Sequence, residues 1–176
     1  MKKKITKIIS GLNEVNIYGN QSIIIDGIAN DSRKVKKNFI YIAIIGNDLD
    51  GHDFINQAIM NGAAVIICSK APNKLNRNIT YILVKNTRKA QGIVASNFYD
   101  NPSNKIDVIM VTGTNGKTTV VSLFYSLFMS MKIKVGMLST IENKIENETY
   151  LSELTTPDSI QLNKYLSKMV DKKCKY

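Results

Sequence analysis

The stretch Val111–Thr119, with the sequence VTGTNGKTT, holds residues whose types and spacing could bind phosphate. Gly113 and Gly116 allow a tight turn and a close approach of the backbone to an anion. Lys117 offers a positive charge to the β- and γ-phosphates of a nucleotide, and Thr118 offers a hydroxyl to Mg²⁺. The sequence therefore predicts a nucleotide-binding loop that serves phosphoryl chemistry.

Segments on both sides of this loop can hold it in place. The apolar run at residues 108–111 predicts a buried strand. A helix over residues 120–131 is predicted by apolar residues at helical spacing, namely Val120, Leu123, Phe124, Leu127, Phe128 and Met131. The free N–H groups and the dipole of a helix that starts after the loop favour an anion there.

The spacing of the loop departs from the general phosphate-loop pattern G-x-x-x-x-G-K-[ST]. That pattern requires glycine at position 111, where this sequence has valine. A Gly-rich turn with an exposed lysine and no ligand is therefore an alternative. The flanking strand and helix make it the weaker one.

Length and composition indicate a soluble globular protein of one or two domains. Of the 176 residues, 44% are hydrophobic, which is enough for a core. No apolar run could span a membrane, and Met1–Ile5 lacks the apolar segment of a signal peptide. Cys68 and Cys174 have no metal-site spacing. They indicate a reducing compartment, so we expect a cytoplasmic protein.

The net charge of +10 raises the possibility of a nucleic-acid partner. The lysines are scattered along the chain, and the aromatic residues do not interleave with basic ones. A basic nucleic-acid-binding module is therefore the weakest hypothesis, and no nucleic-acid partner is expected. The same charge would attract ATP or a nucleotide sugar.

The first hundred residues predict a self-contained α/β domain. Apolar runs predict four strands, at residues 23–28, 39–45, 64–68 and 81–84. Helical patterns predict three helices, at residues 5–12, 52–61 and 87–99. Gly62 is placed to end the second helix, and Thr87 to cap the third.

The segment Asn101–Lys105 breaks this pattern and predicts a boundary between domains at residues 1–100 and 106–176. Beyond the loop and its helix, residues 134–141 predict a strand parallel to the one at 108–111. Two parallel strands do not make a stable sheet on their own. The second domain is therefore expected to be the truncated start of a larger one.

The last part of the chain predicts a polar segment and a final helix. Residues 142–153 predict an exposed hairpin or loop. Thr156 can cap the helix, with Pro157 at its first position and Asp158 complementing its dipole. Its predicted apolar stripe is Leu162, Tyr165, Leu166, Met169 and Val170.

Six motifs occur in an order that resembles the Mur ligase family. They are Asp31-Ser-Arg33, Asp50-Gly-His-Asp-Phe-Ile55, Asn61-Gly-Ala63, Asn101-Pro-Ser103, Thr112-Gly-Thr-Asn-Gly-Lys-Thr-Thr119 and Thr155-Thr-Pro-Asp158. Each motif is weak alone, but the ordered set is specific and covers nearly the whole chain. Within the family it resembles the enzymes that add the third residue of the peptidoglycan stem peptide. The folylpolyglutamate synthetases have a similar loop but lack the Asp-Ser-Arg domain, so they are the second alternative.

The resemblance implies an α/β fold with an N-terminal domain that binds UDP-MurNAc-L-Ala-D-Glu. A P-loop, Rossmann-like domain would follow and bind ATP and Mg²⁺. ATP would phosphorylate the substrate carboxylate, and the amine of diaminopimelate or lysine would displace the phosphate. Residues 1–176 lack the family's third domain, its Glu-containing Mg²⁺ segment and its modified lysine. We therefore expect the chain to be inactive alone, with a non-catalytic UDP-sugar and ATP binder as the alternative. A monomer is also expected.

The resemblance also assigns site residues. Substrate contacts are implied at Ser32, Asn47, Asp48, Leu49, Thr155 and Thr156. ATP contacts are implied at Gly113, Thr114, Asn115, Gly116, Lys117, Thr118 and Thr119. Lys117 would be the catalytic charge, and Thr118 would be the Mg²⁺ ligand. Ser32 could instead cap a turn, and His52 is interpreted as a packing or turn residue and not as a catalyst.

Three positions depart from the family pattern. Asn38 and Met110 replace glycines that usually precede the second strand and the phosphate loop. These two changes indicate relaxed constraint or adjusted packing. Leu154 replaces a polar residue before Thr155 and puts one substrate contact in doubt.

Overall fold

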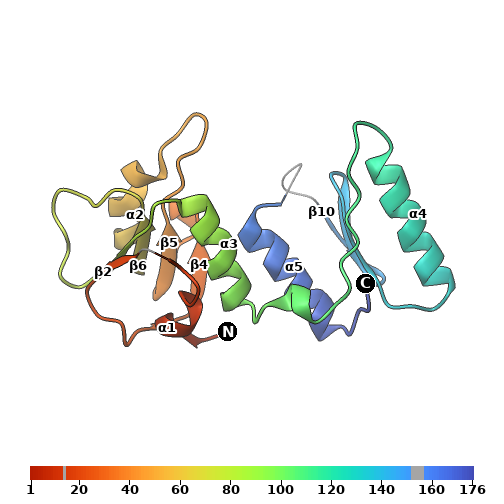
Figure 1. Cartoon of the computed structure of the whole chain (residues 1–176), viewed down its shortest axis with the longest axis horizontal. Helices are drawn as coiled ribbons and strands as arrows, with labels where there is room; N and C mark the ends of the chain where they lie inside the picture. Colours follow the sequence, from red (N-terminus) through yellow and green to blue (C-terminus); the bar gives the residue numbers. More distant parts are fainter. Residues whose placement is uncertain (14, 152–156) are drawn as a thin grey trace. The chain divides into compact units, whose positions relative to one another are not determined.

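The computed structural model describes residues 1–13, 15–151 and 157–176. Within these residues the chain divides into two compact units, Met1–Phe98 and Tyr99–Tyr176 (Figure 1).

The first unit is built on a five-stranded sheet with the strand order β2-β7-β6-β5-β4. The strands are β2 (Asn16–Tyr18), β4 (Gly27–Ala29), β5 (Phe39–Ile42), β6 (Ala63–Cys68) and β7 (Thr80–Leu83). Strands β4 to β7 run parallel, and β2 is antiparallel to β7. A separate antiparallel pair is formed by β1 (Lys3–Lys4) and β3 (Ile24–Ile25).

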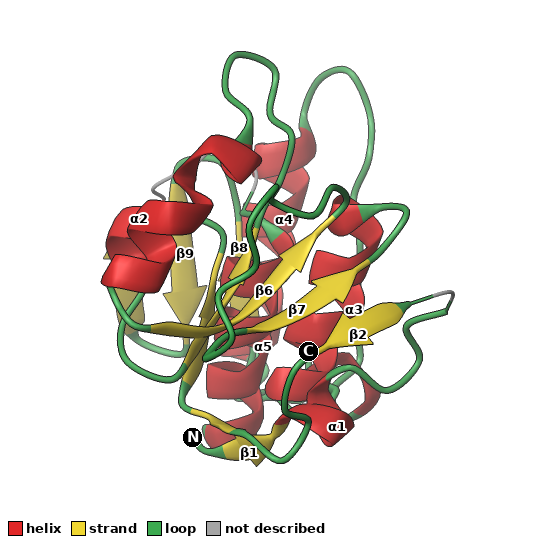
Figure 2. Cartoon of the chain, turned by 90° about the vertical axis from the view of Figure 1, so that its left-hand side faces the viewer, coloured by secondary structure: helices red, strands yellow, loops and turns green. Residues whose placement is uncertain are grey.

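Helices cover both faces of this sheet. The helical segments are α1 (Ile5–Ile8), η1 (Ser32–Lys34), η2 (Gly51–Phe54), α2 (Ile55–Met60) and α3 (Thr87–Phe98). Figures 1 and 2 show α2 on one side of the sheet and α3 on the other. Parallel strands covered on both faces need apolar side chains in both directions, which explains the continuous apolar runs of β5 and β6.

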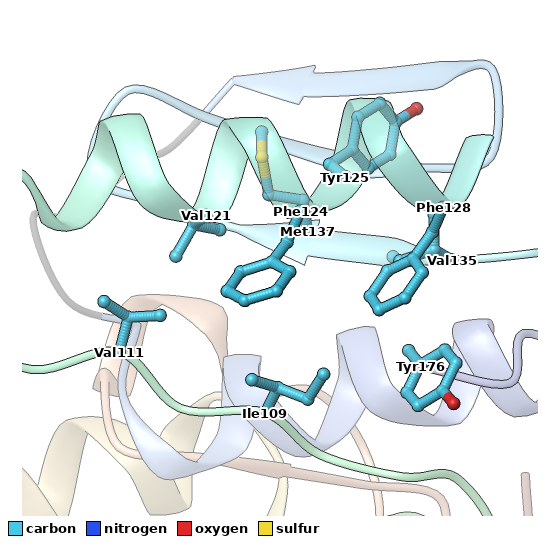
Figure 3. A pocket seen from close by; sticks show the side chains of 10 residues that line it. Ile109, Val111, Val121, Phe124, Tyr125, Phe128, Val135, Met137 and Tyr176 are labelled. Carbon is cyan, nitrogen blue, oxygen red and sulfur yellow. The ribbon is translucent and has the colours of Figure 1, made fainter. Parts of the chain in front are cut away.

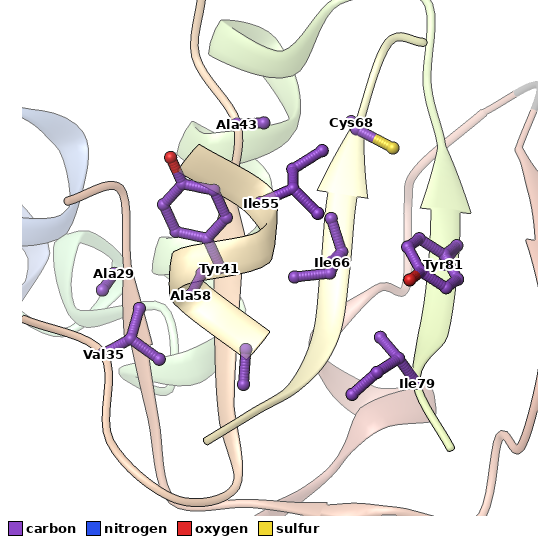
Figure 4. Close-up of a cluster of buried hydrophobic side chains, with 11 residues drawn as sticks. Ala29, Val35, Tyr41, Ala43, Ile55, Ala58, Ile66, Cys68, Ile79 and Tyr81 are labelled. Carbon is purple, nitrogen blue, oxygen red and sulfur yellow. The ribbon is translucent and has the colours of Figure 1, made fainter. Parts of the chain in front are cut away.

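The core of the first unit follows from the alternation of side chains along these strands. Tyr41, Ile66 and Tyr81, from three neighbouring strands, lie on the face that packs against Ile55 and Ala58 of α2 (Figure 4). The intervening residues point to the other face and are also fully buried, among them Ile40, Ile42, Val65, Ile67 and Ile82. The sheet therefore has a core on each side.

The prediction of the central strands and of α3 is confirmed, with local corrections. The strand predicted at residues 23–28 is divided at Asp26 into β3 and β4, which belong to different sheets. The cap of α3 is Asn86, whose Oδ1 accepts from the N–H of Lys89 at 2.9 Å, so the prediction of Thr87 as the cap was wrong. Thr87 is the first helical residue and is buried.

The second unit combines a three-stranded antiparallel sheet with two longer helices. Its elements are η3 (Pro102–Asn104), α4 (Lys117–Ser130), β8 (Gly136–Leu138), β9 (Glu142–Ile145), β10 (Glu148–Leu151) and α5 (Ser159–Asp171). The strand order is β10-β9-β8. A small core joins Ile145 to Leu166, Met169 and Cys174. The hairpin predicted within residues 142–153 is thus confirmed, although Ile145 is buried.

The prediction of a buried strand at Val108–Val111 is wrong. These residues form no strand, and Val108, Ile109 and Met110 are exposed. Strand β8 pairs antiparallel with β9, so the predicted parallel pairing with residues 108–111 is wrong as well. An apolar run becomes a strand only where a partner satisfies its backbone groups, and none of the described strands pairs with this run.

The two helices of this unit also differ from expectation. No side chain of α4 is fully buried, and Leu123, Leu127 and Met131, which belong to the apolar residues that predict the helix, are more than half exposed. Helix α5 begins at Ser159, and its cap is Asp158, whose side chain accepts from the N–H of Gln161 at 2.8 Å. The predicted cap, Thr156, lies outside the described residues. The buried face of α5 is Ile160, Asn163, Leu166 and Met169.

Candidate functional site

The phosphate loop is an exposed turn that leads directly into α4. Gly116 precedes the helix with φ 77°, a left-handed conformation that side chains with a Cβ rarely adopt. No side chain caps the helix start. Among the described residues, the first N–H groups of α4 therefore have no side-chain acceptor, which is the arrangement that binds anions at helix N-termini.

Lys117 and Thr118 occupy the first two positions of α4. The Lys117 ammonium folds back over the loop and donates to the carbonyl oxygens of Gly113 at 2.5 Å and Thr114 at 3.2 Å. The Thr118 hydroxyl lies 3.5 Å from the hydroxyl of Thr140, which follows β8. A ligand phosphate would give Lys117 a negatively charged partner in place of these carbonyls.

The hydroxyls of Thr118 and Thr140 fit the oxygen preference of Mg²⁺, which commonly takes few protein ligands and keeps water and phosphate oxygens. Across the described part of the chain, no group of three or more His, Cys, Asp or Glu side chains could hold a metal ion. Thr140 was not predicted as a site residue. In the sequence it falls within residues 134–141, which predict a strand, and in the structure it lies two residues after β8 ends.

Helix α4, which follows the loop, packs against apolar side chains. Figure 3 shows Val121, Phe124 and Phe128 of α4 facing Ile109, Val111 and Tyr176. These residues line a small cavity of about 60 Å³, and the rings of Phe128 and Tyr176 stack with centroids 4.5 Å apart. The loop is therefore anchored at its helical end, while the segment before it stays exposed.

A second candidate site lies in the first unit, beyond the carboxyl ends of β4 and β5. Ligands of parallel α/β sheets commonly bind at this end of the strands. The pocket has a volume of about 430 Å³, within the range of roughly 300–1,000 Å³ typical of small-molecule sites. It is lined by Asn30, Asp31, Ser32, Arg33, Tyr41, Ile44, Leu49, Gly51, Phe54 and Gln57.

Of the predicted substrate residues in this unit, Ser32 and Leu49 line the pocket. Asn47 and Asp48 do not line it and lie exposed on the loop beside it. Thr155 and Thr156 lie outside the described residues. Two of the residues that line this pocket, Ser32 and Leu49, were thus named as substrate contacts from the sequence. The other lining residues were not.

Ser32 sits at the buried base of the pocket and is held by α2. Its hydroxyl donates to Oε1 of Gln57 at 2.6 Å, and its carbonyl accepts from Nδ2 of Asn61 at 2.8 Å. Gln57 and Asn61 were not predicted, although their i, i+4 spacing places them on one face of a helix. The cap of η1 is Asp31, whose carboxylate accepts from the N–H of Arg33, so the turn does not depend on the Ser32 side chain.

Charges around the pocket are paired. The Arg33 guanidinium donates to both carboxylate oxygens of Asp31 and lowers the pKa of that carboxyl. Burial, with the nearby charges of Asp31 and Asp50, raises the pKa of Tyr41 to about 12. Tyr41 is therefore a neutral phenol at physiological pH, and its hydroxyl donates to the carbonyl of Gly51 at 2.8 Å.

The loop that carries Leu49 is fixed at its end by His52. The imidazole Nδ1 lies 2.6 Å from Oδ1 of Asp50, and Nε2 accepts from the N–H of Ser69 at 3.0 Å. Backbone and side-chain hydrogen bonds from His52 lower the pKa of Asp50. These contacts link the loop to the end of β6, in agreement with the interpretation of His52 as a packing residue.

Comparisons with known proteins decide the family. Residues 24–102 match the catalytic domain of the Mur ligase family, and residues 111–176 match the Mur ligase middle domain. The chain belongs to the Mur ligase family. Members of this family depend on ATP, which agrees with a phosphate loop inside the middle-domain match.

Relatives of this Mur ligase chain include enzymes named UDP-N-acetylmuramoyl-L-alanyl-D-glutamate--2,6-diaminopimelate ligase. The one from Bacteroides fragilis is 43% identical over 173 residues, covering 98% of this chain and 36% of the relative. One from Clostridium acetobutylicum is also 43% identical over 173 residues, with the same coverage of both chains. The chain therefore spans about a third of the length of these relatives.

A solved structure supports the fold of this Mur ligase chain. MurF from Acinetobacter baumannii is 20% identical, with a TM-score of 0.59, and the match covers 93% of this chain and 32% of MurF. This similarity concerns the fold alone. Within residues 1–13, 15–151 and 157–176, no helix combines the length and apolarity needed to cross a membrane.

Proposed function

We propose that this chain supplies the nucleotide-sugar site and the phosphate loop of a ligase. The ligase uses ATP and Mg²⁺ to add diaminopimelate to UDP-MurNAc-L-Ala-D-Glu. The observation that carries this proposal is the 43% identity to diaminopimelate ligases over 98% of the chain. Eight relatives of this chain bear that name, one of them with the added numeral 1, which favours diaminopimelate over lysine. ATP and the UDP-sugar are cytoplasmic metabolites, so the reaction is proposed for the cytoplasm.

The two candidate sites divide the work between two proposed domains. Residues 1–100 bind the uridine nucleotide in the pocket above β4 and β5, with Ser32 and Leu49 in its wall and Asn47 and Asp48 beside it. Residues 106–176 bind ATP through the loop from Gly113 to Thr119. Thr155 and Thr156 are proposed to contact the muramoyl-peptide part of the substrate.

The proposed chemistry joins a carboxylate to an amine in two steps. A carboxylate oxygen of the substrate attacks the γ-phosphorus of ATP, and ADP leaves, which gives an acyl phosphate. The amine of diaminopimelate then attacks the acyl carbon, loses a proton and expels inorganic phosphate. Bound Mg²⁺ would neutralise phosphate charge. The loop residues orient the γ-phosphoryl group and stabilise the charge that develops on it.

Lys117 and Thr118 have distinct tasks in this scheme. The Lys117 ammonium must leave the carbonyls of Gly113 and Thr114 to meet the phosphates. The hydroxyls of Thr118 and Thr140 would hold Mg²⁺ from the side of the protein. The helix start adds N–H donors that point at the same anion.

Binding and turnover are tested separately. Calorimetry on residues 1–176 should show binding of UDP-MurNAc-L-Ala-D-Glu and of Mg-ATP, while phosphate release with diaminopimelate stays at background. Lys117 and Thr118 would contact the phosphate and the metal from one side only. Turnover by residues 1–176 at enzymatic rates would therefore contradict the proposal that these residues hold only part of the active site. Failure to bind either ligand would overturn the proposed function.

A chimera tests ligation. Residues 1–176 are fused to the part of the Bacteroides fragilis ligase that lies beyond the matched region. The chimera should release phosphate and form the UDP-MurNAc-tripeptide in the presence of diaminopimelate. A folded chimera that binds both substrates but forms no tripeptide would show that these sites do not serve this reaction.

A further inference from the structure

The contact between Ser32 and Gln57 fixes the direction of a hydrogen bond at the base of the nucleotide-sugar pocket. The Ser32 side chain is buried, and its oxygen lies 2.6 Å from Oε1 of Gln57. A distance of 2.6 Å falls within the usual range of O–H···O bonds and below that of N–H···O bonds, which begins near 2.7 Å. The amide oxygen therefore faces the serine, and the serine hydroxyl donates its one proton to it.

This direction determines what the pair offers to a ligand. With its proton committed, Oγ of Ser32 can only accept further hydrogen bonds. Nε2 of Gln57 keeps two N–H donors, and within the part of the chain that the structure describes it has no protein partner. Both residues line the pocket of about 430 Å³. The pocket thus presents a buried acceptor beside a donor.

An acceptor of this kind repels phosphate oxygens and requires a ligand group that donates. The walls around it include Ile44, Leu49 and Phe54, which suit the faces of a flat ring better than a diphosphate. The base of a nucleotide sugar meets both conditions. Uracil carries an N3–H donor flanked by two carbonyl acceptors, whereas cytosine has an acceptor at N3 and an amino donor at position 4.

We propose that Gln57 is a specificity-determining residue that orients Ser32 so that the pocket selects uracil over cytosine. Ser32 Oγ accepts from uracil N3–H, and Gln57 Nε2 donates to the carbonyl oxygen at position 4, where cytosine carries an amino group instead. In cytosine held by the same ribose, the lone pair of N3 would face the lone pairs of Ser32 Oγ. The inference rests on the proposed function, because it assumes that the nucleotide sugar binds in this pocket.

The experiment measures the affinity of residues 1–176 for three probes, namely UDP, CDP and 3-methyl-UDP, in which a methyl group replaces the N3 proton. The wild-type chain should bind UDP roughly 10- to 100-fold more tightly than either of the others, the usual cost of an unmatched buried polar group. Equal binding of UDP and 3-methyl-UDP would overturn the contact between Ser32 and N3. In that case the pair would serve a ribose or sugar hydroxyl.

Two matched variants isolate the role of Gln57. Gln57→Glu keeps an acceptor for the Ser32 hydroxyl but replaces the ligand-facing N–H donors with a carboxylate oxygen. That carboxylate would repel O4 of uracil and accept from the 4-amino group of cytosine, so we expect about 10-fold or more weaker UDP binding and a smaller preference for UDP over CDP. Asn56→Asp adds the same charge on the neighbouring exposed residue, which does not line the pocket, and should retain the preference.

The outcomes separate this inference from the proposed function. If the wild-type chain binds neither UDP nor the nucleotide sugar, the proposed site itself fails. If the wild type binds UDP and Gln57→Glu keeps the same affinity and the same ratio of UDP to CDP, the function stands and the role of Gln57 is refuted. Thermal unfolding and Mg-ATP affinity should match the wild type in both variants, because Gln57 is exposed and belongs to the first unit.

Discussion

In the phosphate loop, the positively charged side chain of Lys117 is hydrogen-bonded to the backbone of the loop itself. The ammonium bridges the carbonyls of Gly113 and Thr114 from the first turn of α4. It is thus held within reach of the anion position, where it needs only to exchange neutral acceptors for charged ones.

Lys117→Ala should abolish detectable Mg-ATP binding to residues 1–176. In the chimera it should lower the rate of phosphate release on the order of 100-fold or more, the typical loss when one charge-stabilising donor is removed. Calorimetry and a phosphate assay measure the two effects. Lys164→Ala removes the same charge from an exposed position of α5 and should change neither. Full activity of the Lys117→Ala chimera would contradict the assignment of this loop as the ATP phosphate site.

Burial controls the chemistry of Cys68. Its thiol lies fully buried in β6, and desolvation raises its pKa from near 9 to about 11. The Cys68 thiol has a higher pKa in the folded chain than in the unfolded chain. Its contribution to stability is therefore fully present below pH 9 and is lost as the pH rises from 9 toward 11. Iodoacetamide at pH 8 should therefore leave Cys68 unmodified in the native chain and label it in urea, as mass spectrometry would show. Equal labelling rates in both states would contradict the burial.

At Asn38 the backbone conformation restricts which residue types fit. Its φ is 62°, in the left-handed region, which explains why it departs from glycine without loss of the turn. Its Nδ2 also donates to Oδ2 of Asp26 at 3.1 Å. The sequence alone indicated relaxed constraint here, because the backbone conformation is not visible in a residue type.

Asn38→Ala should destabilise the chain by about 1–2 kcal/mol, because alanine tolerates the left-handed conformation less well than asparagine and also loses the hydrogen bond to Asp26. Asn38→Gly should cost less, because it removes that strain and loses only the contact with Asp26. Urea unfolding of the two variants beside the wild type gives the comparison. A glycine variant less stable than the alanine variant would show that the side-chain contact dominates.

At the scale of elements, the sequence predicts what local apolar patterns determine. The strands β5, β6 and β7 were found because they are uninterrupted apolar runs buried on both faces. Strand β2 was missed, because three residues with mixed polarity become a strand only through pairing with β7. Residues 108–111 were predicted as a strand for the converse reason, since their apolar pattern is present but no described strand pairs with them.

The candidate sites divide in the same way. The phosphate loop was predicted residue by residue, because its contacts are local in sequence. Gln57 and Thr140 were missed, because each reaches its partner, Ser32 or Thr118, through the fold. Helix α4 was predicted correctly as a helix. How far its apolar side chains are buried depends on what packs against them, which their own pattern does not reveal.

The double-sided sheet makes a stability prediction. Ile66→Ala should lower the free energy of unfolding by about 2–5 kcal/mol, because Ile66 is fully buried between β5, β7 and α2. Met60→Ala, at the exposed end of α2, should change it by less than about 0.5 kcal/mol. Urea titration followed by circular dichroism measures both. Similar losses for the two variants would argue against this packing.

At the scale of the whole molecule, the two units differ in how completely their elements are covered. Amides of β5, β6 and β7 should exchange slowly with deuterium, because both faces of these strands are buried. Residues 106–176 should exchange faster as a group, since α4 has no fully buried side chain. Mass spectrometry of peptic peptides resolves the two ranges. Equal protection of both would contradict the difference in burial.

Strand β2 has a partner that is synthesised much later than itself. Its residue Ile17 pairs with Ile82 of β7, so the edge strand of this sheet must wait while the intervening residues leave the ribosome. Non-local pairings of this kind close late and slowly. A nascent chain stalled before β7 has left the exit tunnel should therefore remain sensitive to protease. Release of β7 together with α3, which covers one face of the sheet, should convert the whole first unit to a resistant form in one step.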